Sequence, residues 1–440
     1  MGRYFGTDGI RGKAGVTLTE ETAYKVGKFV GSYYENARIV IGMDTRISSK
    51  GFEEALCRGM IESGAKVYLL GYCSTPCLAY TTMNEKFSCG VMISASHNPY
   101  TDNGIKIFAN DGFKINDEIE GLIEDYIDVP EGIENRDGGE AVDYSSAIRT
   151  YQDWLLNRYH IDLGGMRIIV DLCNGSNCYT AKDVLNSLNG RFDYINDAPD
   201  GVNINNHCGS THLEMLQEAA KNGDYEMGFA FDGDADRVLF VDEDGEVVDG
   251  DRIMYLLSKY LKEKGLLNRD TLVTTVMSNI GLYKALEKKG IVSDIVPVGD
   301  KNVSDSMAKN GFVIGGEQSG HIIYSNDCYF GDGLKTALLV MEALRYYGQS
   351  LKESVAEVKI YPQLLVNEHV KDKKVVLNDE VINEKIAEIG ERLGNNGRIL
   401  VRPSGTEPLI RVMVEAENDQ LCHDLVYEVI DLIKARGYAA

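Results

Sequence analysis

The chain has 440 residues and a formal net charge of −23 at pH 7, from 45 Lys and Arg against 68 Asp and Glu. Its 44% hydrophobic and 26% charged residues are typical of globular domains, which excludes a disordered, collagen-like or coiled-coil protein. The acidity argues against a nucleic-acid binder, which needs a basic surface, and against an anionic membrane as partner. An anionic substrate would therefore require a local basic pocket.

Most of the chain repeats a pattern of short apolar strand, glycine-rich turn and amphipathic helix, which is typical of α/β domains with mixed or parallel sheets. In the first block we expect strands at 37–42 and 66–70 around a helix at 49–63. The second block predicts a strand at 167–172 and a helix at 180–188. The third predicts a strand at 271–277, a helix at 280–289 and an extended segment at 291–296.

The last block differs and predicts a small α+β domain. Its expected elements are a strand at 366–376, a helix at 379–393, strands at 398–402 and 409–415, and a helix at 419–434. The predicted fold class is therefore α/β, with three similar mixed-sheet α/β domains plus a smaller C-terminal α+β domain around a central cleft. The predicted domains are 1–155, 156–253, 254–363 and 364–440.

The nine cysteines are an odd number and include no C-x-x-C pair, so we expect reduced thiols in a cytoplasmic protein. The N-terminus shows no apolar segment typical of a signal peptide. No run of about 18 apolar residues occurs, so we expect no membrane span.

Three aspartates at alternate positions, Asp232, Asp234 and Asp236, are separated by one glycine and one alanine. Their short side chains converge only if the backbone curls into a loop, which small neighbours permit. Three hard oxygen ligands suit Mg²⁺ or Ca²⁺. An EF-hand is disfavoured because Arg237 takes the glycine position and the flanks are strand-like. A solvated acidic turn is the alternative, but an arginine beside the carboxylates favours phosphoryl binding.

The turn Ser94-Ala-Ser-His-Asn-Pro99 follows an apolar, strand-like segment, a position that suits a covalent role for a hydroxyl. A serine hydrolase using His97 as base is disfavoured because adjacent residues rarely aim their side chains at one another. A plain loop is the alternative. Downstream, Lys106 lies between two isoleucines, and this apolar setting predicts a lowered pKa suited to proton transfer. A surface lysine is the alternative.

Two further segments carry binding chemistry. The segment from Arg402 to Pro408, closed by Arg411, combines two guanidinium groups, two hydroxyls and a glycine, which predicts a phosphate cradle rather than a plain hairpin turn. In the segment 315–321, three polar side chains alternate and would share one face if extended, offering donors and acceptors to sugar hydroxyls; they are Glu317, Ser319 and His321.

Together with the N-terminal FGTDGIRG, these segments resemble the α-D-phosphohexomutase superfamily. FGTDGIRG, SASHNP, DGDADR, GEQSGH and RPSGTEP occur in that family's order over nearly the whole chain. Gln318 stands where phosphoglucomutase/phosphomannomutase relatives usually carry Met, which resembles the members that act on glucosamine phosphates. The segments 200–205 and 275–279 point the same way. Ser94, where many relatives have Thr, is a conservative departure.

The resemblance implies a role for each matching residue. The catalytic residues would be Ser96, Lys106, His97, Arg237 and Arg11, with Ser96 as phosphoserine and Lys106 as general base. Mg²⁺ would be bound by Ser96, Asp232, Asp234 and Asp236. The substrate would be bound by Lys301, Glu317, Ser319, His321, Arg402, Ser404, Gly405, Thr406 and Arg411.

The resemblance also implies a reaction: phosphoserine transfers its phosphoryl group to glucosamine 6-phosphate, a 1,6-bisphosphate turns around, and glucosamine 1-phosphate leaves toward UDP-N-acetylglucosamine and cell-wall precursors. A hexose 1,6-bisphosphate would prime the enzyme. The partner is a phosphosugar, and a homodimer is compatible with the sequence. The alternatives are a phosphoglucomutase/phosphomannomutase, a metal-dependent phosphatase and a non-catalytic phosphosugar-binding regulator.

The global charge leads to one more prediction. Six basic residues fall in the proposed site motifs: Arg11, Lys106, Arg237, Lys301, Arg402 and Arg411. Three carboxylates are assigned to Mg²⁺. We therefore expect a positive cleft inside a negative shell.

Overall fold

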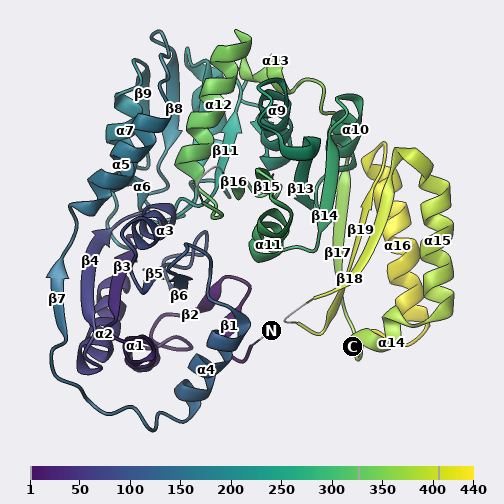
Figure 1. Cartoon of the computed structure of the whole chain (residues 1–440). Helices are drawn as coiled ribbons and strands as arrows, with labels where there is room; N and C mark the ends of the chain where they lie inside the picture. The colour runs from purple at the N-terminus through teal and green to yellow at the C-terminus, as the bar shows by residue number, and fades with distance from the viewer. Residues whose placement is uncertain (1, 326–327, 405–406) are drawn as a thin grey trace. The chain divides into compact units, whose positions relative to one another are not determined.

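The computed structural model describes residues 2–325, 328–404 and 407–440 (Figure 1). This part of the chain contains four β-sheets and divides into two compact units. The first unit comprises Gly2–Met277 and Gly290–Ala356, and the second comprises Ser278–Lys289 and Glu357–Ala440.

The first sheet of the larger unit has seven strands in the order β1-β2-β6-β5-β3-β4-β7. The strands β4, β3 and β5 run parallel, and β6 pairs antiparallel with β5. Its strands are β1 Phe5–Gly6, β2 Gly9–Lys13, β3 Arg38–Met43, β4 Lys66–Tyr72, β5 Cys89–Ile93, β6 Asp102–Ala109 and β7 Glu140–Asp143. The helices of this part are α1 Glu20–Tyr33, α2 Ser49–Glu62, α3 Thr75–Asn84, α4 Asp117–Asp128 and α5 Ala147–Arg158.

The second sheet has five strands in the order β12-β11-β10-β8-β9. The strand β10 pairs parallel with β8 and antiparallel with β11. Its strands are β8 Arg167–Asp171, β9 Arg191–Ile195, β10 Met227–Phe231, β11 Val238–Val241 and β12 Val247–Val248. Its helices are α6 Asn177–Thr180, α7 Lys182–Asn186 and α8 Glu214–Asn222.

The third sheet has four strands in the order β14-β13-β15-β16. The strand β15 pairs parallel with β13 and antiparallel with β16. Its strands are β13 Thr271–Thr275, β14 Val292–Val296, β15 Ile314–Gly316 and β16 Ile322–Tyr324. The helices are α9 Gly250–Glu263, α11 Asp300–Asn310, α12 Gly333–Tyr347 and α13 Leu351–Val355, with a 3₁₀ turn at Asn268–Asp270.

All three sheets share one arrangement at the point where the polar motifs occur. A buried strand of the parallel part leads into a loop, and the chain returns as an antiparallel neighbour; the pairs are β5–β6, β10–β11 and β15–β16. The three loops carry SASHNP, DGDADR and EQSGH, respectively. The repeated topology therefore places each motif at the same edge of its own sheet.

The smaller unit contains an antiparallel sheet in the order β17-β19-β18, packed against α15 and α16 around a core that includes Val412, Val414 and Val426. Its strands are β17 Gln363–His369, β18 Arg398–Pro403 and β19 Leu409–Glu415. Its helices are α10 Ile280–Lys288, α14 Lys373–Leu377, α15 Glu380–Leu393 and α16 Asp419–Ala435, with a 3₁₀ turn at Gly394–Asn396.

The predicted elements are confirmed within two residues at each end, with one exception. The predicted strand 366–376 is wrong after His369, where β17 ends and the chain turns into α14. The Asp372 carboxylate accepts hydrogen bonds from the backbone N–H groups of Lys374 and Val375, and this cap starts a helix among β-branched residues.

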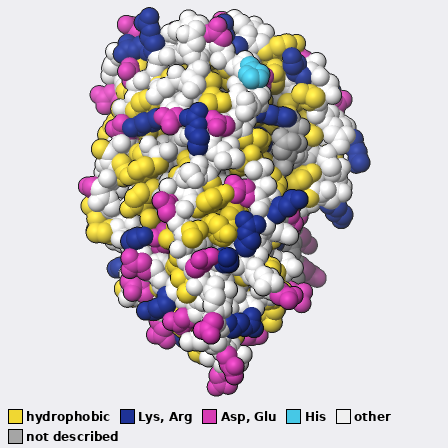
Figure 2. Space-filling view, turned by 60° about the vertical axis from the view of Figure 1, so that its left-hand side comes forward, with side chains coloured by type: hydrophobic (Ala, Val, Ile, Leu, Met, Phe, Trp, Pro, Cys, Tyr) yellow, Lys and Arg dark blue, Asp and Glu magenta, His cyan; other side chains and the backbone are white. Residues whose placement is uncertain are grey.

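Acidic and basic side chains are interspersed on the face of the molecule shown in Figure 2. Within the described residues, no helix is both long and apolar enough to cross a membrane.

Two glycines let α1 and α2 pack closely against each other. A Cβ added at Gly27 would lie 2.2 Å from the Leu56 carbonyl oxygen, and one at Gly59 would lie 2.4 Å from that of Tyr24. Both clashes involve backbone, so relief requires the helices to move apart. This contact holds the helical layer against the core that surrounds β3.

We predict that Gly27→Ala destabilises the protein by about 1–3 kcal/mol, because overpacking forces backbone shifts. The matched control is Gly121→Ala on α4, where an added Cβ would meet nothing within 4 Å. Alanine should stabilise that helix by up to about 1 kcal/mol. Thermal unfolding of both variants checks this, and equal midpoints would contradict the packing argument.

Candidate active site

Ser96 lies fully buried in the β5–β6 loop. Its hydroxyl is directed at the β10–β11 loop, residues 232–237, which carries the three aspartates and is called the acidic loop below. Its Oγ donates a hydrogen bond to Asp232 Oδ2 at 2.6 Å and lies 3.3 Å from His97 Nδ1. Its φ of +53° is in the left-handed region, which costs a residue with a Cβ about 1–2 kcal/mol. Strain of this kind concentrates where the chain must present one group in one direction.

A buried arginine fixes the Ser96 loop from within its own sheet. Arg46 donates to the carbonyl oxygens of Ser96 at 2.9 Å and Asn98 at 2.8 Å, while its Nε binds Asp44 Oδ2 at 2.7 Å. Asp44 also accepts from Ser94 Oγ at 2.6 Å, and Ser94 Oγ accepts the backbone N–H of Ser96 at 2.9 Å. These charge-assisted bonds stabilise the loop in its strained conformation.

The three aspartates Asp232, Asp234 and Asp236 converge as expected and can hold a metal ion. One oxygen of each lies within 4.8 Å of the others, and all three residues are buried. Among the described residues, Asp234 Oδ1 and Asp236 Oδ1 have no hydrogen-bond partner. Burial and the two neighbouring charges raise the pKa of Asp232 well above its ordinary value. Orphaned, mutually repelling oxygens fit a divalent cation with oxygen ligands.

Lys106 does not have the lowered pKa that its apolar neighbours in sequence predict. Burial alone would lower the pKa, but the carboxylates of Asp234, Asp236 and Asp8 raise it well above its ordinary value. The ammonium lies 2.7 Å from Asp234 Oδ2, 3.3 Å from Asp236 Oδ2 and 2.9 Å from Asp8 Oδ2. Ile105 and Ile107 pack into the core of the first sheet. The carboxylates of the N-terminal and acidic loops therefore determine the pKa of Lys106.

Asp8 connects the N-terminal motif to three cations. Its carboxylate binds the side chains of Arg11, Lys106 and Lys114. Burial would raise the pKa of Asp8, but these three cations hold it well below its ordinary value. Lys114 also binds Asp300 at the N-terminus of α11, which ties the first sheet to the third within the larger unit.

His97 contacts Ser96, and Arg237 contacts the Asp232 carboxylate that Ser96 also binds. Burial and the charges of Arg237 and Arg11 lower the pKa of His97 to about 4, so the imidazole is neutral near pH 7. The backbone N–H of Arg237 donates to Asp232 Oδ1 at 3.1 Å, and its Nε lies 3.9 Å from Asp236 Oδ1.

The β15–β16 loop packs on the acidic loop through a β-bridge between Arg237 and His321. His321 Nδ1 and Ser319 Oγ are buried and have no hydrogen-bond partner among the described residues. Glu317 Oε1 accepts from the Gly299 N–H at 3.1 Å. Among the described residues, the β15–β16 loop therefore keeps polar atoms beside the acidic loop that make no hydrogen bond within the protein.

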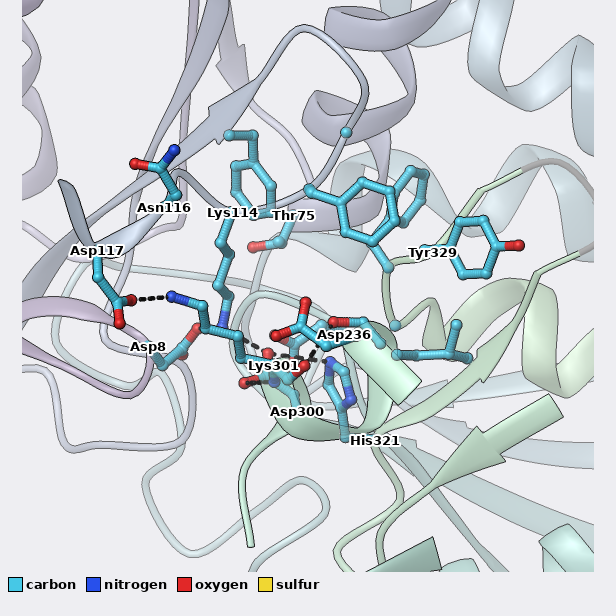
Figure 3. A pocket seen from close by; sticks show the side chains of 18 of the residues that line it. Asp8, Thr75, Lys114, Asn116, Asp117, Asp236, Asp300, Lys301, His321 and Tyr329 are labelled. Carbon is cyan, nitrogen blue, oxygen red and sulfur yellow. Dashed lines mark hydrogen bonds and ion pairs between the residues drawn. The ribbon is translucent and has the colours of Figure 1, made fainter. Parts of the chain in front are cut away.

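A pocket of about 500 Å³ opens between α4 and α11 of the larger unit (Figure 3). Charged side chains gather at one end, where Lys301 binds Asp117 and where Asp236 and His321 line the wall. Tyr329 and other aromatic rings line the opposite end. Six carboxylates and two lysines border this pocket, so the prediction of a positive cleft is wrong for this part of the site.

In the smaller unit, Arg402 and Arg411 face each other in register across β18 and β19. Burial and the Arg411 charge lower the pKa of Arg402, and neither Nε has a partner among the described residues. Two adjacent guanidinium groups repel unless an anion lies between them. Ser404 is buried, and Lys373 donates to its carbonyl oxygen at 2.7 Å. Gly405 and Thr406 lie outside the described residues.

Sequence reasoning missed several polar residues that build the site: Asp8, Asp44, Arg46, Asn205 and Lys373. Asp8 lies inside the N-terminal glycine-rich motif, and Asp44 and Arg46 directly follow a buried strand. Charged residues at such a strand end are a usable signal. No local pattern marks the partners of Asn205 or Lys373.

Comparison with known families matches the chain in four consecutive segments. Residues 2–131, 143–245 and 249–361 match the alpha/beta/alpha domains I, II and III of phosphoglucomutase/phosphomannomutase, and residues 365–432 match its C-terminal domain. The phosphoglucosamine mutase of Lachnoclostridium phytofermentans is 47% identical, covering 100% of this chain and 99% of that protein. The phosphoglucosamine mutase of Streptococcus pyogenes is also 47% identical, covering 99% and 98%.

Solved structures share the fold. A phosphoglucomutase/phosphomannomutase family protein from Burkholderia thailandensis has a TM-score of 0.82 at 22% identity, covering 98% of this chain and 97% of that chain. The Aspergillus fumigatus N-acetylphosphoglucosamine mutase in complex with GlcNAc-6P and magnesium has a TM-score of 0.69 at 18% identity, covering 98% and 95%. A further structure of that fungal enzyme contains glucose 1,6-bisphosphate.

We predict that Mg²⁺ raises the thermal unfolding midpoint of the protein, because an ion that binds only the folded state stabilises it. Asp234→Asn should abolish the shift by removing one buried ligand. Asp224→Asn, at an exposed aspartate before β10, should retain it. A full shift in the Asp234 variant would rule out this triad as the metal site.

Proposed function

We infer the mechanism of this chain from its family, since the chain belongs to the phosphoglucomutase/phosphomannomutase family and, within it, to the phosphoglucosamine mutases. Its reaction is therefore the interconversion of glucosamine 6-phosphate and glucosamine 1-phosphate, an isomerisation by phosphoryl transfer. The proposal concerns which residues perform each part of that reaction.

Ser96 carries the phosphoryl group in this mechanism. The support is its fully buried hydroxyl, its strained backbone and its 2.6 Å bond to Asp232, which together hold one nucleophile in one direction. Phosphoserine 96 donates its phosphoryl group to O1 of glucosamine 6-phosphate. The resulting 1,6-bisphosphate reverses its orientation and returns the 6-phosphoryl group to Ser96, releasing glucosamine 1-phosphate.

Asp232, Asp234 and Asp236 would hold Mg²⁺ together with an oxygen of Ser96. When bound, the cation would neutralise charge on the transferring phosphoryl group and take over the oxygens now shared with Lys106. Two observations support magnesium: the orphaned oxygens of the triad, and the magnesium present in the fungal enzyme.

Lys106 is the proposed proton acceptor for the sugar hydroxyl. The carboxylates that raise the pKa of Lys106 would be shared with a bound cation, which would lower that pKa and allow the neutral amine to accept the proton. Arg11 and Arg237 stabilise the phosphoryl oxygens, and neutral His97 accepts or donates a hydrogen bond at Ser96. All four are buried or partly buried; His97 contacts the Ser96 hydroxyl, while the three cations lie beside carboxylates of the same cluster, where charges act strongly.

The sugar is held by Glu317, Ser319, His321 and Lys301, supported by the unpartnered atoms of Ser319 and His321. The non-reacting phosphate is held by Arg402, Ser404, Gly405, Thr406 and Arg411, supported by the facing guanidinium groups. A hexose 1,6-bisphosphate serves as intermediate and primer, as the complex of the fungal enzyme suggests for that relative.

Three wider expectations remain part of the proposal. The nine cysteines are all free thiols, which supports a cytoplasmic location. The proposed division into domains at 1–155, 156–253, 254–363 and 364–440 is supported by the presence of four sheets, although Gln363 of β17 lies one residue outside the last range. A homodimer stays a prediction.

We predict that Ser96→Ala lowers the mutase rate by at least about 10³-fold, because the only phosphoryl carrier in this mechanism is lost. Ser145→Ala, at an exposed serine, is the matched control and should keep full activity. The rate is measured with primed substrate, and Ser96 phosphorylation by intact-protein mass. A fully active Ser96→Ala enzyme would eliminate the phosphoserine mechanism.

We also predict a higher kcat/KM for glucosamine 6-phosphate than for glucose or mannose 6-phosphate. One coupled assay across the three substrates measures it. A preference for glucose or mannose phosphates would favour a phosphoglucomutase/phosphomannomutase activity. Net release of inorganic phosphate would instead favour a phosphatase, which the burial of Ser96 argues against.

A further inference from the structure

Asn205, from the loop that follows β9, reaches across to the Ser96 loop. Its Nδ2 donates to the carbonyl oxygen of Ser96 at 2.8 Å and to that of Asn98 at 2.9 Å. Arg46 binds the same two carbonyl oxygens. The peptide plane after Ser96 is therefore held by one donor from its own sheet and one from the next sheet.

Cys173 fixes which way the Asn205 amide faces. Its Sγ donates to Asn205 Oδ1 at 2.8 Å, and the Asn205 N–H donates to the Cys173 carbonyl oxygen at 3.2 Å. With Oδ1 engaged by the thiol, Nδ2 is left to face the carbonyl groups. Both residues are buried and have positive φ angles, +57° for Asn205 and +58° for Cys173.

The same turn contacts the acidic loop. The Ser176 N–H donates to the Gly233 carbonyl oxygen at 2.9 Å. A Cβ at Gly233 would lie 2.6 Å from the Ser96 carbonyl oxygen and 2.9 Å from Asn205 Nδ2. The Ser96 loop, the Cys173–Ser176 turn and the loop of the three aspartates are therefore in direct contact, with no room for a side chain at Gly233.

We propose that Asn205 is a positioning residue for phosphoryl transfer, oriented by Cys173, which sets the placement of Ser96 Oγ relative to the aspartate triad. The inference rests on the proposed role of Ser96 as phosphoryl carrier. The carbonyl that Asn205 holds defines the peptide plane from which the Ser96 side chain projects at φ +53°. Loss of this donor leaves Arg46, from the first sheet, to hold the two carbonyl oxygens without a donor from the second sheet.

Two variants remove the donor in different ways. Asn205→Asp keeps shape and tolerance for positive φ, and Asn205→Gly removes the side chain without backbone strain or added charge. We expect kcat to fall by about 30- to 100-fold in both, because a displacement of about 1 Å costs about 10²-fold in rate. KM for glucosamine 6-phosphate should change by less than about threefold, because Asn205 does not touch the sugar.

The matched control is Asn189→Gly in the same part of the chain. Asn189 also has a positive φ, of +53°, but it is exposed and its amide binds Asp162. Its kcat should be unchanged. The rate of Ser96 phosphorylation by glucose 1,6-bisphosphate, followed by intact-protein mass, should fall in parallel with kcat in the Asn205 variants alone.

Cys173 supplies a rescue test. Cys173→Ala removes the donor to Asn205 Oδ1, and Cys173→Ser restores one. We expect the alanine variant to lose about tenfold in kcat and the serine variant to recover most of it, at comparable thermal unfolding midpoints. A merely structural role would lower both midpoints without separating the two rates.

The proposal is overturned if the Asn205 variants keep kcat within about threefold, if KM rises instead of kcat falling, or if the two Cys173 variants have equal rates. A separate outcome tests the premise. Turnover by wild-type enzyme with no phosphoryl group ever found on Ser96 would overturn the proposed function, and the role of Asn205 with it.

Discussion

The site depends on one electrostatic constraint, the burial of the Lys106 ammonium among the carboxylates of Asp8, Asp234 and Asp236. Four acidic groups, counting Asp232, cannot share a dry loop cluster without cations. The cations that the chain itself supplies beside these carboxylates are Lys106, Lys114, Arg11 and Arg237. Within the part of the chain that the structure describes, one oxygen of Asp234 and one of Asp236 nevertheless remain without hydrogen bonds, and a divalent metal ion would fill this deficit.

A strand arrangement that recurs in three sheets positions these charged side chains. Each of three sheets passes from its parallel part to an antiparallel neighbour through one polar loop, so three unrelated motifs occupy equivalent positions. The loops then bind one another directly, through Ser96 and Asp232, and through the bridge between Arg237 and His321. The acidic chain does not contradict an anionic substrate, because the phosphoryl-binding charges in the proposed mechanism come from a few buried cations, while acidic groups line the pocket.

Much of this could be predicted from sequence because the motifs are local. Ser96 and the triad are each marked by neighbours that force a loop at a strand end, and the helical and strand periods identified most elements. Contacts between distant loops were not predictable. The pKa of Lys106 is raised by Asp234, Asp236 and Asp8, which are distant in sequence, and the contact of Asn205 with Ser96 forms only when the second sheet meets the first. At 370–376, where the sequence predicts a strand, the helix cap formed by Asp372 outweighs the β propensity of the valines, and the chain forms α14.

The central claim is that Ser96 carries the phosphoryl group that the sugar receives. Enzyme labelled with ³²P at Ser96 and mixed with unlabelled glucosamine 6-phosphate and Mg²⁺ tests it in a single turnover. The account predicts that the label moves to the sugar phosphates at the rate of turnover, with no burst of inorganic phosphate. Label that stays on the protein during turnover, or leaves as inorganic phosphate, would contradict the account.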